Sequence, residues 1–439
     1  MSPPPVHPRD PTGWTALVAL GFAGLLAVRL TIPSQPFFDE VHYLPAARAI
    51  LALSHPANPE HPPLGKQLIA LGMAVLGDNP LGWRIMPAAA GVLALVSAMR
   101  ALWFATGSRF ASLAGGALLV TALPLLVQAR IAMLDIFMVG FVMLALWMCA
   151  AACREAETGR WRLAIAGVAL GAAMAAKWNA VPVAMLPGLA FLAVRLRHAG
   201  WRALTTRRGP PVAGITLAEA ALWLGLVPVA TYALSYWPLF FYARDAIAPD
   251  GLIEWHRRML ALQETPLHPH PYQSHWYEWV IDWRPIWYLY EPVDGAQRGV
   301  LLVGNPLVML AGLPALAWCG WAGLRATLAW VRGRAANRQG NRYWAHLAVA
   351  VLYAASLGLW IVAAKNVQFY YHYILPSCFL AAALALALDA LWQRGWRVVP
   401  LAVLAGSGVL FAVFWPILTA APLDGPDAFA RWTWLNSWR

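Results

Sequence analysis

Apolar residues in this chain gather into long stretches that are separated by shorter polar ones. About eleven of these stretches approach twenty residues, which is the helix length that crosses roughly 30 Å of hydrocarbon. They lie near residues 14–32, 84–104, 110–128, 131–152, 161–177, 179–195, 217–241, 300–322, 345–364, 367–390 and 397–419. The pattern predicts an all-α fold, a polytopic transmembrane helical bundle of about 11 spans that forms a single domain over residues 1–439.

The polar segments between the stretches predict which side of the membrane each faces. Segments 153–162, 195–208, 325–342 and 392–397 are rich in Arg, and such loops are cytoplasmic in membrane proteins. The Pro-rich residues 1–12 are then expected to form a disordered cytoplasmic tail. Segments 33–83 and 242–299 become two long outer loops, and the chemistry is expected there because long ordered loops are more often functional than incidental.

Both outer loops carry signs of contact with the membrane surface. Residues 41–53 and 64–76 are apolar but too short to span, and their spacing is typical of helices that lie in the interface. The 242–299 loop is dense in Trp, Tyr, His and Pro, a composition suited to lipid headgroups. We expect this loop to fold back onto the bilayer.

Composition agrees with a lipid environment and excludes other classes. Apolar residues make up 60% of the chain and charged residues 12%, too little polar surface to cover a soluble particle. The net charge of +12 is spread between the spans, so no nucleic-acid-binding face is predicted. No phosphate loop, dinucleotide fingerprint or nucleophile elbow is present, which argues against a nucleotide-driven mechanism.

Asp39 and Glu40 are the first candidates for catalysis. They follow the first span directly and precede the first interfacial helix. A carboxylate at this place can act as a general base at the membrane surface. The alternative is structural: Asp39 caps the helix and Glu40 favours its N-terminal dipole.

Four cations are predicted at outer membrane boundaries. The chain has 29 Arg but only three Lys, and Lys66, Lys177 and Lys365 all fall at these boundaries together with Arg130. Cations on the disfavoured side need a compensating role, and an anionic phosphate is the simplest one. The alternative is ordinary snorkelling of long side chains.

Further candidates surround these groups. His61 opens the run HPPLGK, whose two prolines and glycine hold Lys66 in a stiff turn. Asp135 lies just inside the fourth span, where a charge needs a partner, and we expect it to orient Arg130 or another cation.

The run from His268 to Trp279 is open to three interpretations. His268, His270 and His275 offer nitrogen ligands, but no carboxylate spacing supports a defined metal site. Aromatic side chains such as Tyr272 and Trp276, together with His270, suit a groove for a sugar or a peptide. Simple interfacial anchoring explains the same residues equally well.

Six runs occur together in the order seen in one enzyme family: FFDEVHY, HPPLGK, ARIAMLD, KWNA, HPYQSHWYEW and YYHYILP. Over almost its whole length the chain resembles the protein O-mannosyltransferases, glycosyltransferase family 39 in the membrane-embedded C superfamily. Eukaryotic members carry a β-trefoil domain in the loop after the seventh span. Residues 242–299 are too few to hold it, so the chain resembles the compact bacterial type.

The resemblance implies transfer of mannose from polyprenyl-phosphate-mannose to Ser or Thr hydroxyls of exported proteins, at the outer face of a bacterial cytoplasmic membrane, with acceptors delivered by the secretion machinery. It puts Asp39 in the position of the base, with Arg130, Lys66 and Lys365 available to the phosphate. Direct displacement predicts inversion. No cofactor is expected, although a divalent cation stays open.

Two other functions stay in competition with this one. Relatives in the same superfamily use lipid-linked sugars to modify a lipid or a glycan. A transporter without chemistry is the third possibility, but it would favour ionisable groups near mid-membrane and an internal repeat.

Overall fold

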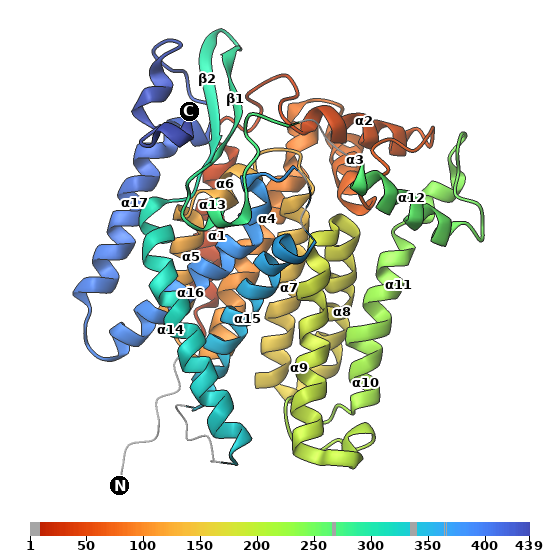
Figure 1. The fold of residues 1–439 in the computed structure, drawn as a ribbon, viewed down its shortest axis with the longest axis vertical. Coiled ribbons are helices and arrows are strands. Elements are labelled where there is room, and N and C mark those ends of the chain that lie inside the picture. The colour runs from red at the N-terminus through yellow and green to blue at the C-terminus, as the bar shows by residue number, and fades with distance from the viewer. Residues whose placement is uncertain (1–8, 266–268, 334–339, 364, 366) are drawn as a thin grey trace.

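The computed structural model describes residues 9–265, 269–333, 340–363, 365 and 367–439 of the chain. Helices dominate, and they form one bundle with a smaller layer of elements across one end (Figure 1). The helical fold class is therefore confirmed.

The bundle is built from helices that coincide with all eleven predicted stretches. They are α1 (Thr12–Ala27), α4 (Pro80–Thr106), α5 (Arg109–Thr121), α6 (Pro124–Gln128), α7 (Asp135–Arg154), α8 (Gly159–Ala176), α9 (Val181–Ala199), α10 (Leu217–Ala221), α11 (Val227–Leu234), α14 (Pro306–Val331), α15 (Gly340–Val362), α16 (Ile374–Gln393) and α17 (Val398–Leu418). Among the described residues, eight helical segments are long and apolar enough to cross a membrane. The chain is an integral membrane protein, and the count of eleven spans stays a prediction.

Three predicted spans differ from the helices in detail. The stretch 110–128 breaks at Leu123, whose φ of +80° ends α5, and Pro124 then starts α6. The stretch 131–152 becomes helical only at Asp135. The stretch 300–322 begins as a strand, and its helix starts at Pro306, where the Asn305 side chain accepts a hydrogen bond from the Leu307 N–H.

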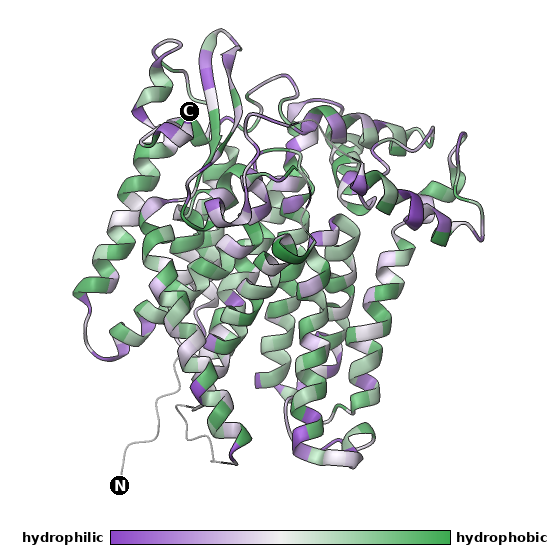
Figure 2. Cartoon of the chain, viewed as in Figure 1, coloured by the Kyte–Doolittle hydropathy of each residue, from purple (hydrophilic) through white to green (hydrophobic). Residues whose placement is uncertain are grey.

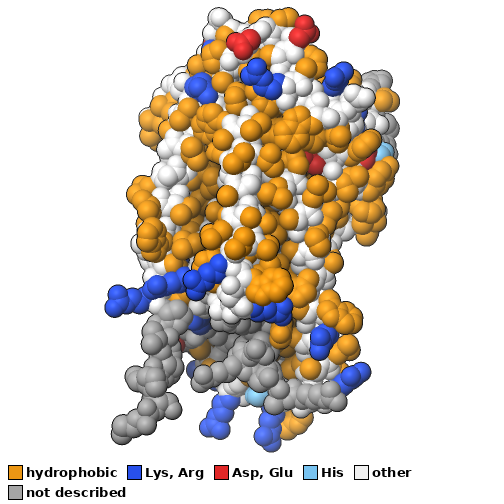
Figure 3. All heavy atoms as spheres, turned by 90° about the vertical axis from the view of Figure 1, so that its left-hand side faces the viewer, with side chains coloured by type: hydrophobic (Ala, Val, Ile, Leu, Met, Phe, Trp, Pro, Cys, Tyr) orange, Lys and Arg blue, Asp and Glu red, His pale blue; other side chains and the backbone are white. Residues whose placement is uncertain are grey.

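The apolar surface agrees with a bundle in lipid. Hydrophobic residues cover the helix bodies and polar residues gather at their ends (Figure 2). In the side view, apolar side chains form a broad band, with Lys and Arg concentrated below it (Figure 3). Helix α16 lies deepest in the bundle: 78% of the residues in its most apolar stretch are buried. In α17, at the edge of the bundle, only 17% of the corresponding residues are buried.

We call the elements across the other end the cap layer. It contains α2 (Glu40–Leu51), α3 (Leu64–Leu76), α12 (Leu252–Glu264), α13 (Trp276–Val280) and an antiparallel hairpin of β1 (Ile286–Val293) and β2 (Ala296–Leu302) (Figure 1). The first two match the helices predicted at 41–53 and 64–76. The hairpin departs from the all-α expectation, and it turns at Asp294 and Gly295, which both have positive φ.

Candidate active site

Asp39 stands at the junction between α1 and α2. It is the residue before α2, yet its side chain makes no capping hydrogen bond, so the capping interpretation is not realised. Burial raises the pKa of Asp39 to about 6, and the neighbouring Asp135 also raises it while Lys177 lowers it. A carboxyl group with a pKa near the working pH is suited to accept a proton.

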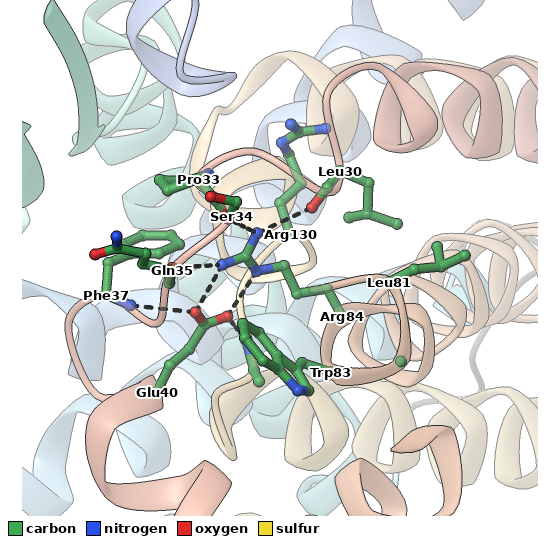
Figure 4. A network of polar contacts seen from close by, with 12 residues as sticks. Leu30, Pro33, Ser34, Gln35, Phe37, Glu40, Leu81, Trp83, Arg84 and Arg130 are labelled. Carbon is green, nitrogen blue, oxygen red and sulfur yellow. Dashed lines mark hydrogen bonds and ion pairs between the residues drawn. The ribbon is translucent and has the colours of Figure 1, made fainter. Parts of the chain in front are cut away.

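Glu40, the next residue, has a different environment. Its two carboxylate oxygens lie 2.8 Å from Nε and Nη2 of Arg84, and both side chains are fully buried (Figure 4). Glu40 also accepts hydrogen bonds from the backbone N–H groups of Phe37 and Ala132, at 3.3 and 3.0 Å. The remaining Arg84 donors reach three backbone carbonyls, those of Leu30, Pro33 and Gln35.

This network ties the segment before Asp39 to α4 and to the linker before α7. Every oxygen and nitrogen of the Glu40 and Arg84 pair has a partner, so neither is available to a substrate without breaking the network. We therefore assign Glu40 a positioning role: it fixes the start of α2 and leaves Asp39 directed elsewhere. Successive residues of a helix point about 100° apart, which allows two adjacent carboxylates to take separate roles.

Asp135 and Lys177 form a second buried ion pair. Lys177 Nζ donates to Asp135 Oδ2 at 2.6 Å, and the ammonium also lies 5.0 Å from the ring centroid of Tyr371. The expected partner of Asp135 therefore proves to be Lys177 rather than Arg130. The pair joins α7 to the start of the α8–α9 connection, beside Asp39.

Arg130 lies at the end of α1, close to the Glu40 and Arg84 pair (Figure 4). Its guanidinium donates to the carbonyls of Leu26 and Arg29 at 2.6 and 3.0 Å, and more weakly to Leu25, where it completes the end of α1. Burial lowers the pKa of Arg130 to about 9. These bonds use both N–H groups of Nη1 and one of Nη2, out of the five guanidinium donors, and the predicted contact of Arg130 with a phosphate stays a prediction.

All three lysines of the chain converge on His61. Burial and the charges of Lys177, Lys365 and Lys66 hold the pKa of His61 well below its ordinary value. Lys66 Nζ donates to the carbonyls of Asn58 and His61 at 2.6 and 2.9 Å. Burial lowers the pKa of Lys66 to about 7 and that of Lys365 to about 8. Such a group of confined cations would be stabilised by a bound anion.

The aromatic run of the second long loop packs close to this cluster. The Ser274 N–H donates to the carbonyl of Gln368 at 2.8 Å, and the His270 ring meets the Phe369 ring edge-on at 5.2 Å. His270 Nδ1 accepts from the N–H of Tyr272 at 3.1 Å, and Trp276 opens α13. His268 lies outside the described residues.

Aromatic rings then continue without interruption toward Asp39. Phe369 stacks on Tyr371 at 5.5 Å, Tyr371 meets Phe38 edge-on at 5.9 Å, and Phe38 stacks on Tyr288 at 4.0 Å. We call the five rings from His270 to Tyr288 the aromatic wall. The predicted groove residue His270 is its outer end, whereas Tyr272 and Trp276 lie beside it.

Several residues of the site carried no signal that sequence reasoning used. Tyr288 lies on the unexpected hairpin, and Gln128 at the end of α6 donates to its hydroxyl at 3.0 Å. Tyr371 lies in the YYHYILP run, and Phe38 in FFDEVHY. Both runs were recognisable as motifs, but aromatic residues at membrane boundaries are too common to single out.

The described residues contain no group of three or more His, Cys, Asp or Glu that could hold a metal ion. The site offers the Asp39 carboxylate, which belongs to neither ion pair, together with the cluster of lysines and the aromatic wall. This arrangement can take a proton from a hydroxyl while it stabilises an anionic leaving group.

Comparison with known proteins points in one direction. The family described as dolichyl-phosphate-mannose-protein mannosyltransferase matches residues 60–223, and the C-terminal four TMM region of protein-O-mannosyltransferase matches 249–438. A polyprenol-phosphate-mannose--protein mannosyltransferase of Mycobacterium tuberculosis is 30% identical over 500 residues, covering 98% of this chain and 91% of the relative. One of the same name from Mycolicibacterium smegmatis is 29% identical over 517 residues, covering 100% and 95%.

Solved structures share the fold. The protein O-mannosyltransferase Pmt1-Pmt2 complex of Saccharomyces cerevisiae, bound to the sugar donor, aligns with a TM-score of 0.79 at 14% identity, covering 97% of this chain and 93% of the other. ArnT from Cupriavidus metallidurans aligns with a TM-score of 0.58 at 18% identity, covering 92% and 65%.

Proposed function

Because the chain belongs to the protein O-mannosyltransferase family, we propose that it transfers mannose from polyprenyl-phosphate-mannose to Ser or Thr hydroxyls of exported proteins. The observation that carries the proposal is the 30% identity to a polyprenol-phosphate-mannose--protein mannosyltransferase over 98% of the chain. Matching chemistry comes from Asp39, on which Lys177 acts, and from the three lysines gathered around His61. The identity of the donor follows from the names of these relatives. The identity of the acceptor is a further part of the proposal.

In this proposal Asp39 is the general base. It accepts the proton of the acceptor hydroxyl as the hydroxyl oxygen forms a bond to the anomeric carbon. The bond from that carbon to the phosphate oxygen breaks, and its electron pair leaves with the polyprenyl phosphate. The pKa of about 6 makes Asp39 largely ionised at neutral pH yet basic enough to share a proton in the transition state.

Lys66, Lys365 and Lys177 are proposed to stabilise the departing phosphate. Burial lowers the pKa of Lys66 and of Lys365, Lys177 also lowers that of Lys365, and Lys177 itself is paired with Asp135. A phosphate in the cluster would give these buried groups an anionic partner. Arg130 is proposed to contact the phosphate through Nε or Nη2, whose N–H groups are not all used at the end of α1. One displacement without a second nucleophile inverts the anomeric configuration, and no metal or other cofactor is required.

The polypeptide acceptor is proposed to approach along the aromatic wall. Rings from His270 to Tyr288 lead from the second long loop to Asp39, and flat rings offer apolar contact with a polar edge. The cap layer is proposed to face the outside of the cytoplasmic membrane, where an unfolded chain leaves the secretion machinery. A lipid or glycan acceptor is the alternative.

The test is mannose transfer by detergent-solubilised protein. Polyprenyl-phosphate-mannose and a Ser/Thr-rich peptide are supplied to wild type, to Asp39→Asn, and to Asp245→Asn, an exposed acid of the second long loop that serves as the matched control. We expect transfer with inversion by wild type and control, and a loss on the order of a hundredfold or more in Asp39→Asn. A folded wild type that consumes the donor with lipid but never with peptide would favour the alternative acceptor.

A further inference from the structure

Two buried oxygens near Tyr288 have no hydrogen-bond partner among the described residues. One is Oδ1 of Asp135, whose other oxygen is held by Lys177, and the second is Oε1 of Gln128. Both side chains are 0% exposed. Buried polar atoms in folded proteins are almost always paired, so two exceptions near one candidate base require an explanation.

Tyr288 lies close to both Gln128 and Asp135. Its hydroxyl accepts from Gln128 Nε2 at 3.0 Å, and the charges of Asp135 and Asp39 both act on it. Whichever way the Gln128 amide is turned, one of its two polar groups stays without a partner. The three side chains come from α6, α7 and β1, so parts of the chain far apart in sequence meet at one point.

Phe38 covers this point. Its ring stacks on Tyr288 at 4.0 Å, and Tyr288 is only 4% exposed beneath it. Phe38 also has a φ of +50°, a left-handed conformation that is costly for a residue with a Cβ. A strained residue that covers unpaired polar atoms, directly before the candidate base, is typical of a functional site.

We propose that Asp135, Gln128 and Tyr288 bind hydroxyl groups of the donor's sugar and thereby select which sugar is transferred. This inference rests on the proposed function and concerns the residues that recognise the sugar of the donor. Sugar hydroxyls are hydrogen-bond donors, and the two free oxygens are acceptors. A buried site built to pair with hydroxyls rejects a ligand that lacks them, because its own polar atoms then stay unpaired. Phe38, which stacks on Tyr288, moves aside when the sugar enters.

The test separates binding of the sugar from binding of its carrier. Thermal unfolding of the full chain in detergent is followed by fluorescence of its 25 Trp residues, with polyprenyl phosphate or polyprenyl-phosphate-mannose added. The variants are Gln128→Leu and Tyr288→Phe, which keeps the ring under Phe38. Tyr290→Phe is the matched control, since its hydroxyl lies on the same strand but donates to the Pro426 carbonyl.

In wild type and control, the mannose-bearing lipid is expected to stabilise more than the bare phosphate lipid. Both test variants should lose this difference, with the mannosyl donor bound on the order of tenfold more weakly, while stabilisation by polyprenyl phosphate stays unchanged and proves the fold. The inference would be overturned if the mannosyl donor stabilised both variants as much more than polyprenyl phosphate as it does wild type, or if the two lipids stabilised wild type equally. A wild type that shows the difference but transfers no mannose to peptide overturns the proposed function alone.

Discussion

Burial is the largest cause of the raised pKa of Asp39, and two charges of opposite sign also act on it, which offers a test by paired substitutions. Lys177 lowers the pKa and Asp135 raises it, around a value of about 6. Lys177→Gln removes the cation but keeps an N–H donor for Asp135. Asp135→Asn removes the anion but keeps an oxygen that can accept from Lys177.

The two substitutions should shift the pKa of Asp39 in opposite directions. A unit charge within roughly 4 to 6 Å of a partly buried carboxyl shifts its pKa by about one unit or more. Loss of the cation disfavours the carboxylate, so Lys177→Gln raises the pKa to about 7 or above, whereas Asp135→Asn lowers it to about 5. At pH 6, the ionised fraction then falls from about one half to about one tenth in the first variant, and rises to about nine tenths in the second.

The assay is the pH dependence of kcat/KM for mannose transfer between pH 5 and 9. The acid limb should move to higher pH in Lys177→Gln and to lower pH in Asp135→Asn, whatever happens to the plateau. A lower plateau of kcat/KM is expected from weaker donor binding, and by itself it does not show whether Asp39 is the base. Acid limbs that stay together in all three proteins, or move the same way, would refute the assignment of Asp39 as the titrating base.

Three further outcomes are expected. Glu40→Gln should lower the unfolding temperature strongly, because breaking a fully buried ion pair by removing one charge costs about 3 to 5 kcal/mol, and the double variant Glu40→Gln with Arg84→Met should recover part of the loss. Lys66→Met and Lys365→Met should each raise the dissociation constant of polyprenyl phosphate, by on the order of tenfold from lost charge-assisted hydrogen bonds, measured by thermal shift; unchanged affinity in both would exclude them as phosphate ligands. Activity should persist in excess chelator, and a loss that added divalent metal restores would show that a cation takes part.

The bundle was predictable because its signal is local. Each span is a run of about twenty apolar residues, and every predicted run coincides with a helix. The hairpin was missed because β1 begins with consecutive buried residues, Ile286 to Leu289, rather than the alternation that marks a half-buried strand. The Asp294 and Gly295 pair at its turn was the available signal.

The site was predictable only in part. Asp39 and the lysines stood out by their chemistry and by their predicted position at outer membrane boundaries. Their partners did not, because pairing across a bundle depends on how helices pack: Asp135 and Lys177 are 42 residues apart, and Gln128 and Tyr288 are 160 apart. The sequence likewise could not show that Glu40 is paired and Asp39 is not, because this depends on where Arg84 lies in the fold.

The Glu40 and Arg84 pair also constrains how the protein is made. Glu40 is synthesised 44 residues before Arg84, so its carboxylate must stay in water until α4 has entered the membrane. The segment ahead of Asp39 is then fixed, but Tyr288, Tyr371 and Lys365 come from the later half of translation. In a chain interrupted midway, Glu40 and Arg84 are both present, but the candidate site still lacks Tyr288, Tyr371 and Lys365 and is incomplete.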